Sequence, residues 1–257
     1  MNIRLLLPIC TKTQGLLCKE SWFYQERLDL LNIAFNQPFF TNPKNNIDIV
    51  ITSNNFFCFS ASCLAESDFY INEFLIPRLN DLSNKKTLII GIDLYNERIS
   101  FNPYRGIPSL VAALYSKNNK FFLQQAIWEC WNGCDRFCFQ NQNRILRYNQ
   151  IEILLSCGDI LFGCNKKLSY LNLSTKVDII IDLAHLNISK NLYRVWGKIT
   201  QKVEQLSDIL IITQQLTKSS TLIQNNNYKL LWYNHLSKLL RQNIIKGANY
   251  YLIDIII

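Results

Sequence analysis

Short apolar segments, most of them rich in β-branched residues, alternate along the chain with longer segments whose apolar residues follow helical spacing. The short segments predict strands at Ile3–Leu7, Ile47–Thr52, Thr87–Ile92, Leu110–Tyr115, Ile151–Cys157, Val177–Leu183, Asp208–Thr213, Lys229–Tyr233 and Tyr250–Ile257. The longer segments predict amphipathic helices at Glu20–Phe35, Ala61–Leu82 and Ser189–Leu206. This alternation indicates an α/β fold. Since no repeat or Pro-, Gly- or Ser-rich linker interrupts the pattern, we predict a single domain spanning residues 1–257.

The composition agrees with a packed protein. With 257 residues, 49% of them hydrophobic and 18% charged, the chain is long enough to bury a large core and is neither disordered nor fibrous in character. No apolar run approaches the roughly 20 residues of a membrane-spanning helix. The apolar stretch Leu5–Cys10 is too short for an export signal. Nine cysteines, an odd number, then favour reduced thiols, so we predict a cytoplasmic protein.

The charge balance keeps a second class of function open. The net charge is +8, from 27 Lys and Arg against 19 Asp and Glu, and such a charge attracts anionic partners. The basic residues are scattered, which favours an ordinary solvated surface. However, Asp178 and Asp182 lie on one side of the strand predicted at Val177–Leu183, and a metal-dependent nuclease uses carboxylates of this kind. A nucleic-acid-binding protein or nuclease is therefore the alternative function.

Two residues are candidates for thiol chemistry. Cys157 ends the apolar run IEILLSC and precedes Gly158-Asp159 and a predicted helix, so backbone N–H groups there can stabilise a thiolate and an oxyanion. The competing interpretation is a small buried apolar residue. Lys120 follows the strand Leu110–Tyr115, and a lysine beside a thiol would stabilise a negatively charged intermediate. Its competing interpretation is an exposed loop lysine.

The sequence contains little that predicts a cofactor. Cys130, Cys134 and Cys138 recur every four residues and would share one face of a helix, where thiolates bind zinc or an iron–sulfur cluster. Their spacing does not match a C-x-x-C motif and no fourth ligand is evident, so buried thiols are the favoured interpretation. Neither His185 nor His235 lies in a catalytic motif, and no phosphate-binding loop is present. We therefore predict no cofactor.

In chain order, the segments IDIVIT, TLIIGID, KFFL and ILLSCGDI resemble the nitrilase, or carbon–nitrogen hydrolase, superfamily. In that family a lysine before an apolar pair follows one strand, and the nucleophilic cysteine ends another strand in a Cys-x-Asp or Cys-x-Glu setting. Lys120 resembles the first and Cys157-Gly158-Asp159 the second. The similar order continues through VDIIIDLAH and DILIIT to the closing strands, so it covers nearly the whole chain.

The resemblance implies a four-layer αββα sandwich, a homodimer, and attack of a thiol on the carbon of a small amide or nitrile. It also implies a glutamate as general base and a lysine that stabilises the developing charge. Glu129 resembles an accessory glutamate of the family. The general base should follow IDIVIT, yet Ser53-Asn54-Asn55 stand there, and neither Ser nor Asn takes a proton from a thiol at neutral pH. The resemblance thus implies either a divergent hydrolase or a pseudoenzyme.

Overall fold

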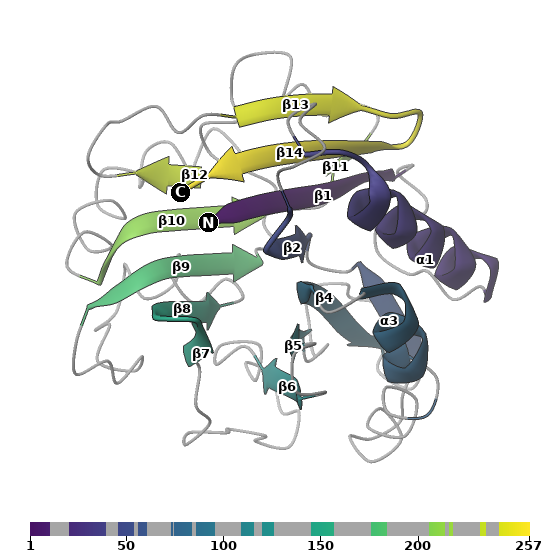
Figure 1. Cartoon of the computed structure of the whole chain (residues 1–257). Coiled ribbons are helices and arrows are strands. Elements are labelled where there is room, and N and C mark those ends of the chain that lie inside the picture. The colour runs from purple at the N-terminus through teal and green to yellow at the C-terminus, as the bar shows by residue number, and fades with distance from the viewer. Residues whose placement is uncertain are drawn as a thin grey trace.

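A computed structural model describes the parts of the chain that form the sheets and two of the helices. The described residues are 1–10, 21–39, 46–53, 56–60, 73, 75–83, 86–95, 109–115, 120–125, 145–156, 176–183, 206–213, 216–217, 232–234 and 242–257. Two sheets run through this part of the chain, and helices α1 (Ser21–Asn36) and α3 (Ile76–Ser83) lie beside the first sheet (Figure 1). These elements show an α/β fold, as predicted.

The two sheets are built around parallel strands. The first sheet has the order β13 (Gln242–Lys246), β14 (Tyr250–Ile256), β1 (Asn2–Cys10), β2 (Ile49–Thr52), β4 (Thr87–Tyr95), β5 (Ser109–Tyr115) and β6 (Lys120–Gln125), with β11 (Leu216–Thr217) on β1 and β3 (Phe57–Ser60) on β4. The second sheet has the order β12 (Trp232–Asn234), β10 (Ser207–Thr213), β9 (Val177–Leu183), β8 (Ile151–Ser156) and β7 (Ile145–Tyr148). In the first sheet β1, β2 and β4 run parallel, and in the second β8, β9 and β10 do.

The two sheets pack face to face through aliphatic side chains. On β1 the odd positions Ile3, Leu5 and Leu7 join an inter-sheet cluster, because successive side chains of a strand point to opposite faces. The second sheet contributes in the same way from its three parallel strands, as with Leu155 and Ile181. Both faces of the parallel strands are covered, which explains their almost continuous apolar sequence.

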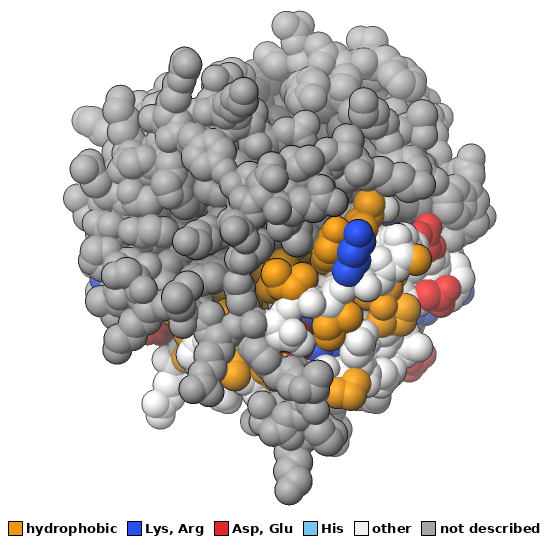
Figure 2. All heavy atoms as spheres, turned by 90° about the horizontal axis from the view of Figure 1, so that it is seen from above, with side chains coloured by type: hydrophobic (Ala, Val, Ile, Leu, Met, Phe, Trp, Pro, Cys, Tyr) orange, Lys and Arg blue, Asp and Glu red, His pale blue; other side chains and the backbone are white. Residues whose placement is uncertain are grey.

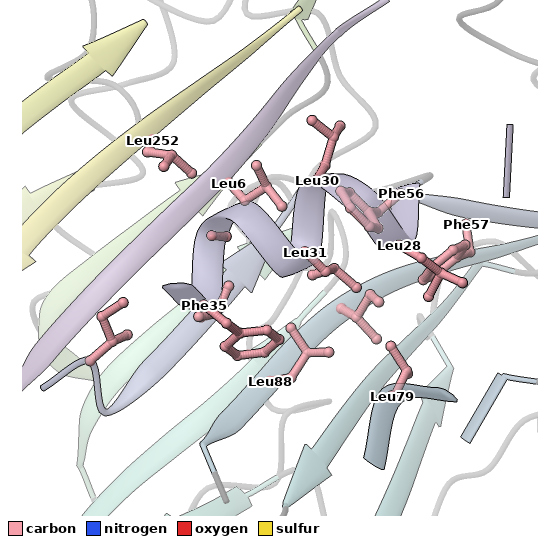
Figure 3. Packing of buried hydrophobic residues seen from close by; sticks show 14 of the residues in the cluster. Leu6, Leu28, Leu30, Leu31, Phe35, Phe56, Phe57, Leu79, Leu88 and Leu252 are labelled. Carbon is pink, nitrogen blue, oxygen red and sulfur yellow. The ribbon is translucent and has the colours of Figure 1, made fainter. Parts of the chain in front are cut away.

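The other face of the first sheet is covered by the two helices. Leu28, Leu31 and Phe35 of α1 pack with Leu79 of α3 against the sheet (Figure 3). Leu88 of β4 lies in the same cluster. The described residues therefore form a helix layer and two sheet layers. The fourth layer of the predicted αββα sandwich would include the helix predicted at Ser189–Leu206, which apart from Leu206 lies outside the described residues.

A buried ion pair joins the helix layer to the first sheet. Arg4 of β1 and Asp254 of β14 are both fully buried, and the Arg4 guanidinium donates to both carboxylate oxygens at 2.6 and 2.7 Å. The same guanidinium donates to the carbonyl oxygens of Ala34, Gln37 and Pro38 at 2.7 to 2.9 Å, at the carboxyl end of α1. A cation placed there also interacts favourably with the helix dipole. Arg4 thus fastens α1 to the centre of the sheet.

The elements differ from the predicted ones at several places. β3, β6 and β7 were not predicted as strands, and Lys120 begins β6 instead of lying in a loop. The helix predicted at Ala61–Leu82 is confirmed at its end by α3, while residues 61–72 lie outside the described part. No helix in the described part has the length and apolar character that crossing a membrane requires.

Candidate functional site

A short segment of the chain connects β2 to β3 in the first sheet. Both strands pair in parallel with β4, where Ile51 is opposite Ile89 and Phe57 is opposite Ile92. Positions 52–56, which we call the loop after β2, therefore span only positions 90 and 91 of β4. Asn54 and Asn55 lie outside the described residues. This is the segment in which the family resemblance expects the general base, and it contains Ser53, Asn54 and Asn55 instead.

Gly91 of β4 holds both ends of this loop. Its N–H donates to Thr52 Oγ1 at 3.1 Å, and its carbonyl oxygen accepts from the Phe56 N–H at 3.0 Å. The Phe56 ring is itself buried beneath the Arg27 guanidinium, which lies 5.1 Å from the ring centroid. The loop is thus fixed at its entry and at its exit.

A hydrogen bond joins the end of β2 to the second sheet. Thr213, the last residue of β10, donates from Oγ1 to the Thr52 carbonyl oxygen at 2.9 Å, and both residues are fully buried. Because β2 and β10 both end at this contact, their carboxyl ends lie at the same edge of the two sheets. We call this edge the carboxyl edge. Ligand sites of α/β proteins form at such ends of parallel strands.

Ser53 gives the carboxyl edge a neutral polar character. It is fully buried, and its hydroxyl has no hydrogen-bond partner within the described part of the chain. A buried hydroxyl without a partner costs roughly 1–3 kcal/mol, so natural proteins contain few of them. A carboxylate buried in this place would be costlier still, which is consistent with a serine here.

In the second sheet, the strand that precedes Cys157 ends at the same edge. Cys157 itself lies outside the described residues, but Ser156 immediately before it ends β8. Ser156 pairs with Asp182 of β9, and Asp182 pairs with Ile212 of β10, one residue before Thr213. The strand that leads to Cys157 therefore ends level with the strand that contacts Thr52.

Lys120 is not brought to the carboxyl edge. It is opposite Tyr115 in the hairpin of β5 and β6, beyond the pair formed by Leu88 and Leu114. Tyr115 is one residue beyond Leu114, so the row that contains Lys120 and Tyr115 crosses β4 at Thr87. Thr87 is opposite Ile49 of β2. Thr52 lies three residues farther along and three strands away, roughly 10 Å and 14 Å respectively. The strand register thus places the Lys120 backbone at the amino ends of the parallel strands.

The other end of β6 does reach the carboxyl edge. Gln125, the last residue of β6, is opposite Leu110 of β5, and Leu110 is opposite Ile92 of β4. Ile92 is in turn opposite Phe57, so Gln125 lies in the same row of the sheet as Phe57. Glu129 follows four positions later in the sequence and lies outside the described residues. Chain order therefore favours Glu129 over Lys120 as a neighbour of the site.

Asp178 and Asp182 do not form the carboxylate pair that a nuclease would need. Asp178 is exposed and its Oδ2 accepts from the Glu152 N–H at 2.8 Å, whereas Asp182 is fully buried at the other end of β9. Four residues of strand separate them by roughly 13 Å, too far to bind one metal ion together. The sequence correctly predicted that the two side chains are on one face of β9, but their separation along the strand prevents them from forming one site.

The remaining candidate ligands fall on residues that the structure does not describe. Cys130, Cys134, Cys138 and His185 lie outside the described residues. Within the described part, no group of three His, Cys, Asp or Glu side chains is arranged to hold a metal ion. Figure 2 shows one face of the molecule, where the hydrophobic side chains of the described part lie among uncharged side chains and a few charged ones.

The sequence contained an unused signal for the residues of the carboxyl edge. The segments IDIVIT and DILIIT both end an apolar run with a threonine, and these are Thr52 and Thr213. A polar residue at the end of a buried strand needs a hydrogen-bond partner. Here the two threonines belong to facing strands and one bonds to the backbone of the other.

Comparison with known proteins identifies similar folds. The sequence matches no protein-family model and no curated protein. An amidase from Nesterenkonia sp. AN1, with acrylamide added to its active-site cysteine, has a TM-score of 0.56 at 10% identity, and the alignment covers 100% of this chain and 93% of the amidase. A CN-hydrolase superfamily protein from Xanthomonas campestris has a TM-score of 0.50 at 11% identity, and the alignment covers 84% of this chain and 76% of that protein. A glutamine-dependent NAD+ synthetase from Acinetobacter baumannii has a TM-score of 0.51 at 13% identity, and the alignment covers 84% of this chain and 38% of the synthetase.

Proposed function

We propose, from the premise that this chain has the fold of the nitrilase superfamily, that it is a carbon–nitrogen hydrolase-like protein with Cys157 as nucleophile. The observation that carries the proposal is the shared carboxyl edge. There β8 ends directly before Cys157, level with the end of β10, and Thr213 of β10 bonds to the end of β2. The substrate class we propose is a small amide or nitrile.

The proposed reaction places clear demands on the site. The Cys157 thiolate attacks the amide carbon, a C–S bond forms, and the C–N bond breaks as the amine leaves with a proton. Water then hydrolyses the thioester and regenerates the thiol. Both steps need a group that moves a proton. Because the loop after β2 contains Ser53, Asn54 and Asn55, we assign this role to Glu129 and do not extend the proposal to Lys120, whose backbone lies at the opposite edge.

Selective labelling tests the nucleophile. Purified protein is treated with iodoacetamide at several pH values and the modified cysteines are identified by peptide mapping. We expect Cys157 to be labelled first below about pH 8, where an ordinary thiol is mostly protonated. Labelling of any other cysteine before Cys157 would contradict the assignment.

Activity measurements test the rest of the proposal. Ammonia release is measured from a panel of small aliphatic amides and nitriles. Cys157→Ala should abolish any release, and Glu129→Gln should lower it by roughly 100-fold or more, the usual contribution of a general acid–base group. Lys120→Met serves as the matched control and should leave the rate unchanged. A strong loss of ammonia release in Lys120→Met would mean that the lysine takes part in the reaction, and it would contradict the conclusion drawn from the strand register.

The proposal also includes the setting in which the protein works. A thiol nucleophile needs a reducing compartment, which agrees with the predicted cytoplasm. The homodimer implied by the family resemblance stays a prediction, and light scattering of the purified protein measures it.

A further inference from the structure

Hydrogen bonds cross between the two sheets at both edges. At the carboxyl edge Thr213 Oγ1 donates to the Thr52 carbonyl oxygen at 2.9 Å in a fully buried contact. At the amino edge the Tyr148 hydroxyl donates to Asp48 Oδ1 at 3.4 Å in a partly buried one. The shorter and more deeply buried of these two hydrogen bonds is therefore at the carboxyl edge, where the strand that precedes Cys157 ends.

Among the described residues, the buried cluster between the two sheets is aliphatic. It consists of side chains such as Ile51, Ile89, Ile153 and Ile211. Attraction between such surfaces follows the buried area and has no preferred direction, so it does not determine how the two sets of strand ends face each other. A hydrogen bond restricts both distance and angle. The Thr213 contact supplies that restriction at the carboxyl edge.

Both partners of this contact are tied to the proposed site. Thr213 is opposite Leu183 of β9. The residue before Leu183 is Asp182, which is opposite Ser156 at the end of β8. On the other sheet, Thr52 is fastened to Gly91 and begins the loop that contains Ser53. The contact therefore connects the end of β2 with the set of strand ends that includes the end of β8.

We propose that Thr213 is a positioning residue: its hydroxyl holds the end of β2 in register with the end of β8, the strand that leads directly to Cys157. This inference rests on the proposed function, because it concerns the same cysteine. Thr213 need not contact the substrate. It acts through the Thr52 carbonyl group.

The test measures the rate of Cys157 alkylation by iodoacetamide as a function of pH in the full-length protein. Thr213→Val removes the hydroxyl and retains the shape of the side chain. We expect alkylation at neutral pH to slow by about threefold to tenfold, the factor that one hydrogen bond supports, and the pH profile to move to higher pH. Thr213→Ser retains the donor and should restore the parent profile.

Two matched controls separate positioning from stability. Thr87→Val makes the same change at a buried threonine of the amino edge, and Tyr148→Phe removes the other cross-sheet hydroxyl. Neither should change the Cys157 profile. Should Thr213→Val fail to fold, Thr213→Ala removes the same bond at a smaller side chain. If the folded Val or Ala variant keeps the parent profile, or if Ser does not restore it, the inference is wrong. If Cys157 of the parent labels no faster than other thiols, the proposed function itself fails.

Discussion

Two groups of buried polar side chains lie along the first sheet's central strands, and they differ in charge. The Arg4 cluster, made of Arg4, Asp254 and the carbonyl groups at the end of α1, contains a full ion pair with every contact short. The Thr52 cluster, made of Thr52, Ser53, Gly91 and Thr213, contains hydroxyl and backbone groups. The charged cluster has its donors satisfied, whereas the neutral one includes a hydroxyl without a partner in the described part.

The difference separates a structural role from a functional one. A buried ion pair requires nearly complete hydrogen bonding, and a cluster that achieves it becomes rigid and intolerant of change. A neutral cluster leaves a smaller penalty when one group lacks a partner. We therefore expect changes in the Arg4 cluster to affect stability strongly, and changes in the Thr52 cluster to affect stability little and Cys157 chemistry more.

The largest effect is expected from Asp254→Asn. This nearly isosteric change leaves the fully buried Arg4 guanidinium without its counter-charge. The free energy of unfolding should fall by roughly 3–5 kcal/mol, as it does when one partner of a buried pair is removed. Urea denaturation followed by circular dichroism measures the loss.

A double variant provides the control for this prediction. Arg4→Met combined with Asp254→Asn removes both charges, and it also removes the donor to the carbonyl oxygens of Ala34, Gln37 and Pro38. Because the two residues form one ion pair, the loss in the double variant should be smaller than the sum of the losses in the two single variants. Additive losses would show that packing, and not the unpaired charge, accounts for the effect.

An intermediate effect on stability is expected from Thr213→Val. Loss of one buried hydrogen bond should lower the free energy of unfolding by about 1 kcal/mol. Thr87→Val, at a buried threonine on the opposite edge, provides the reference for exchanging a hydroxyl for a methyl group. A loss as large as that of Asp254→Asn would remove the distinction between the two clusters.

A smaller, pH-dependent effect is expected at Lys86, which donates to the Phe35 carbonyl oxygen at 2.8 Å beside the Arg4 cluster. Burial, and secondarily the positive charge of Arg4, lower the pKa of Lys86 below its ordinary value of 10.5. Between the lowered pKa and 10.5 the unfolded state binds more protons than the folded state, so Lys86 makes stability rise with pH in that window.

Lys86→Met should remove this contribution. Urea midpoints measured as the pH approaches 10.5 should then rise less steeply, or fall more steeply, than those of the parent. Lys246→Met, at an exposed lysine of β13, is the control and should keep the parent slope. The same slope in Lys86→Met and the parent would contradict the burial of this amine.

The smallest effect is expected from Arg147→Gln. Arg147 pairs with Glu152 at 2.9 Å across β7 and β8, but its side chain is 78% exposed. Exposed ion pairs contribute between zero and about 1 kcal/mol, so the urea midpoint should hardly change. A loss comparable to that of Thr213→Val would mean that exposure is a poor guide to the value of an ion pair in this protein.

Sequence patterns predicted the buried strands well because burial on both faces leaves a strong apolar signal. The strand at Val177–Leu183 has the predicted bounds, and α1 differs from its prediction by one residue at each end. β7 was missed although Asn149, at a φ of 56°, marks its turn to β8. The apolar run of β3 is too short to be separated from its surroundings by periodicity alone.

The site was predictable as an order of elements but not as a geometry. The sequence indicated that Cys157 follows a buried strand, and β8 ends where expected. It did not indicate which end of a strand Lys120 would occupy, because that depends on the turn between β5 and β6. Asn118-Asn119 was a hairpin signal that places Lys120 at the start of the returning strand, but as a two-residue turn it would pair Lys120 with Lys117, whereas the structure pairs it with Tyr115. The contact of Thr213 with Thr52 spans 161 residues and depends on sheet packing.

The ion pair of Arg4 with Asp254 also has a consequence for biosynthesis. The two residues are 250 positions apart, so a ribosome must make almost the entire domain before the counter-charge of Arg4 exists. Until then β1 lacks its neighbour β14, and a central strand of the first sheet has an open edge and an uncompensated cation. Such long-range pairings form slowly and leave aggregation-prone surfaces exposed. Nascent chains of this protein should therefore depend on chaperones until the last strand emerges.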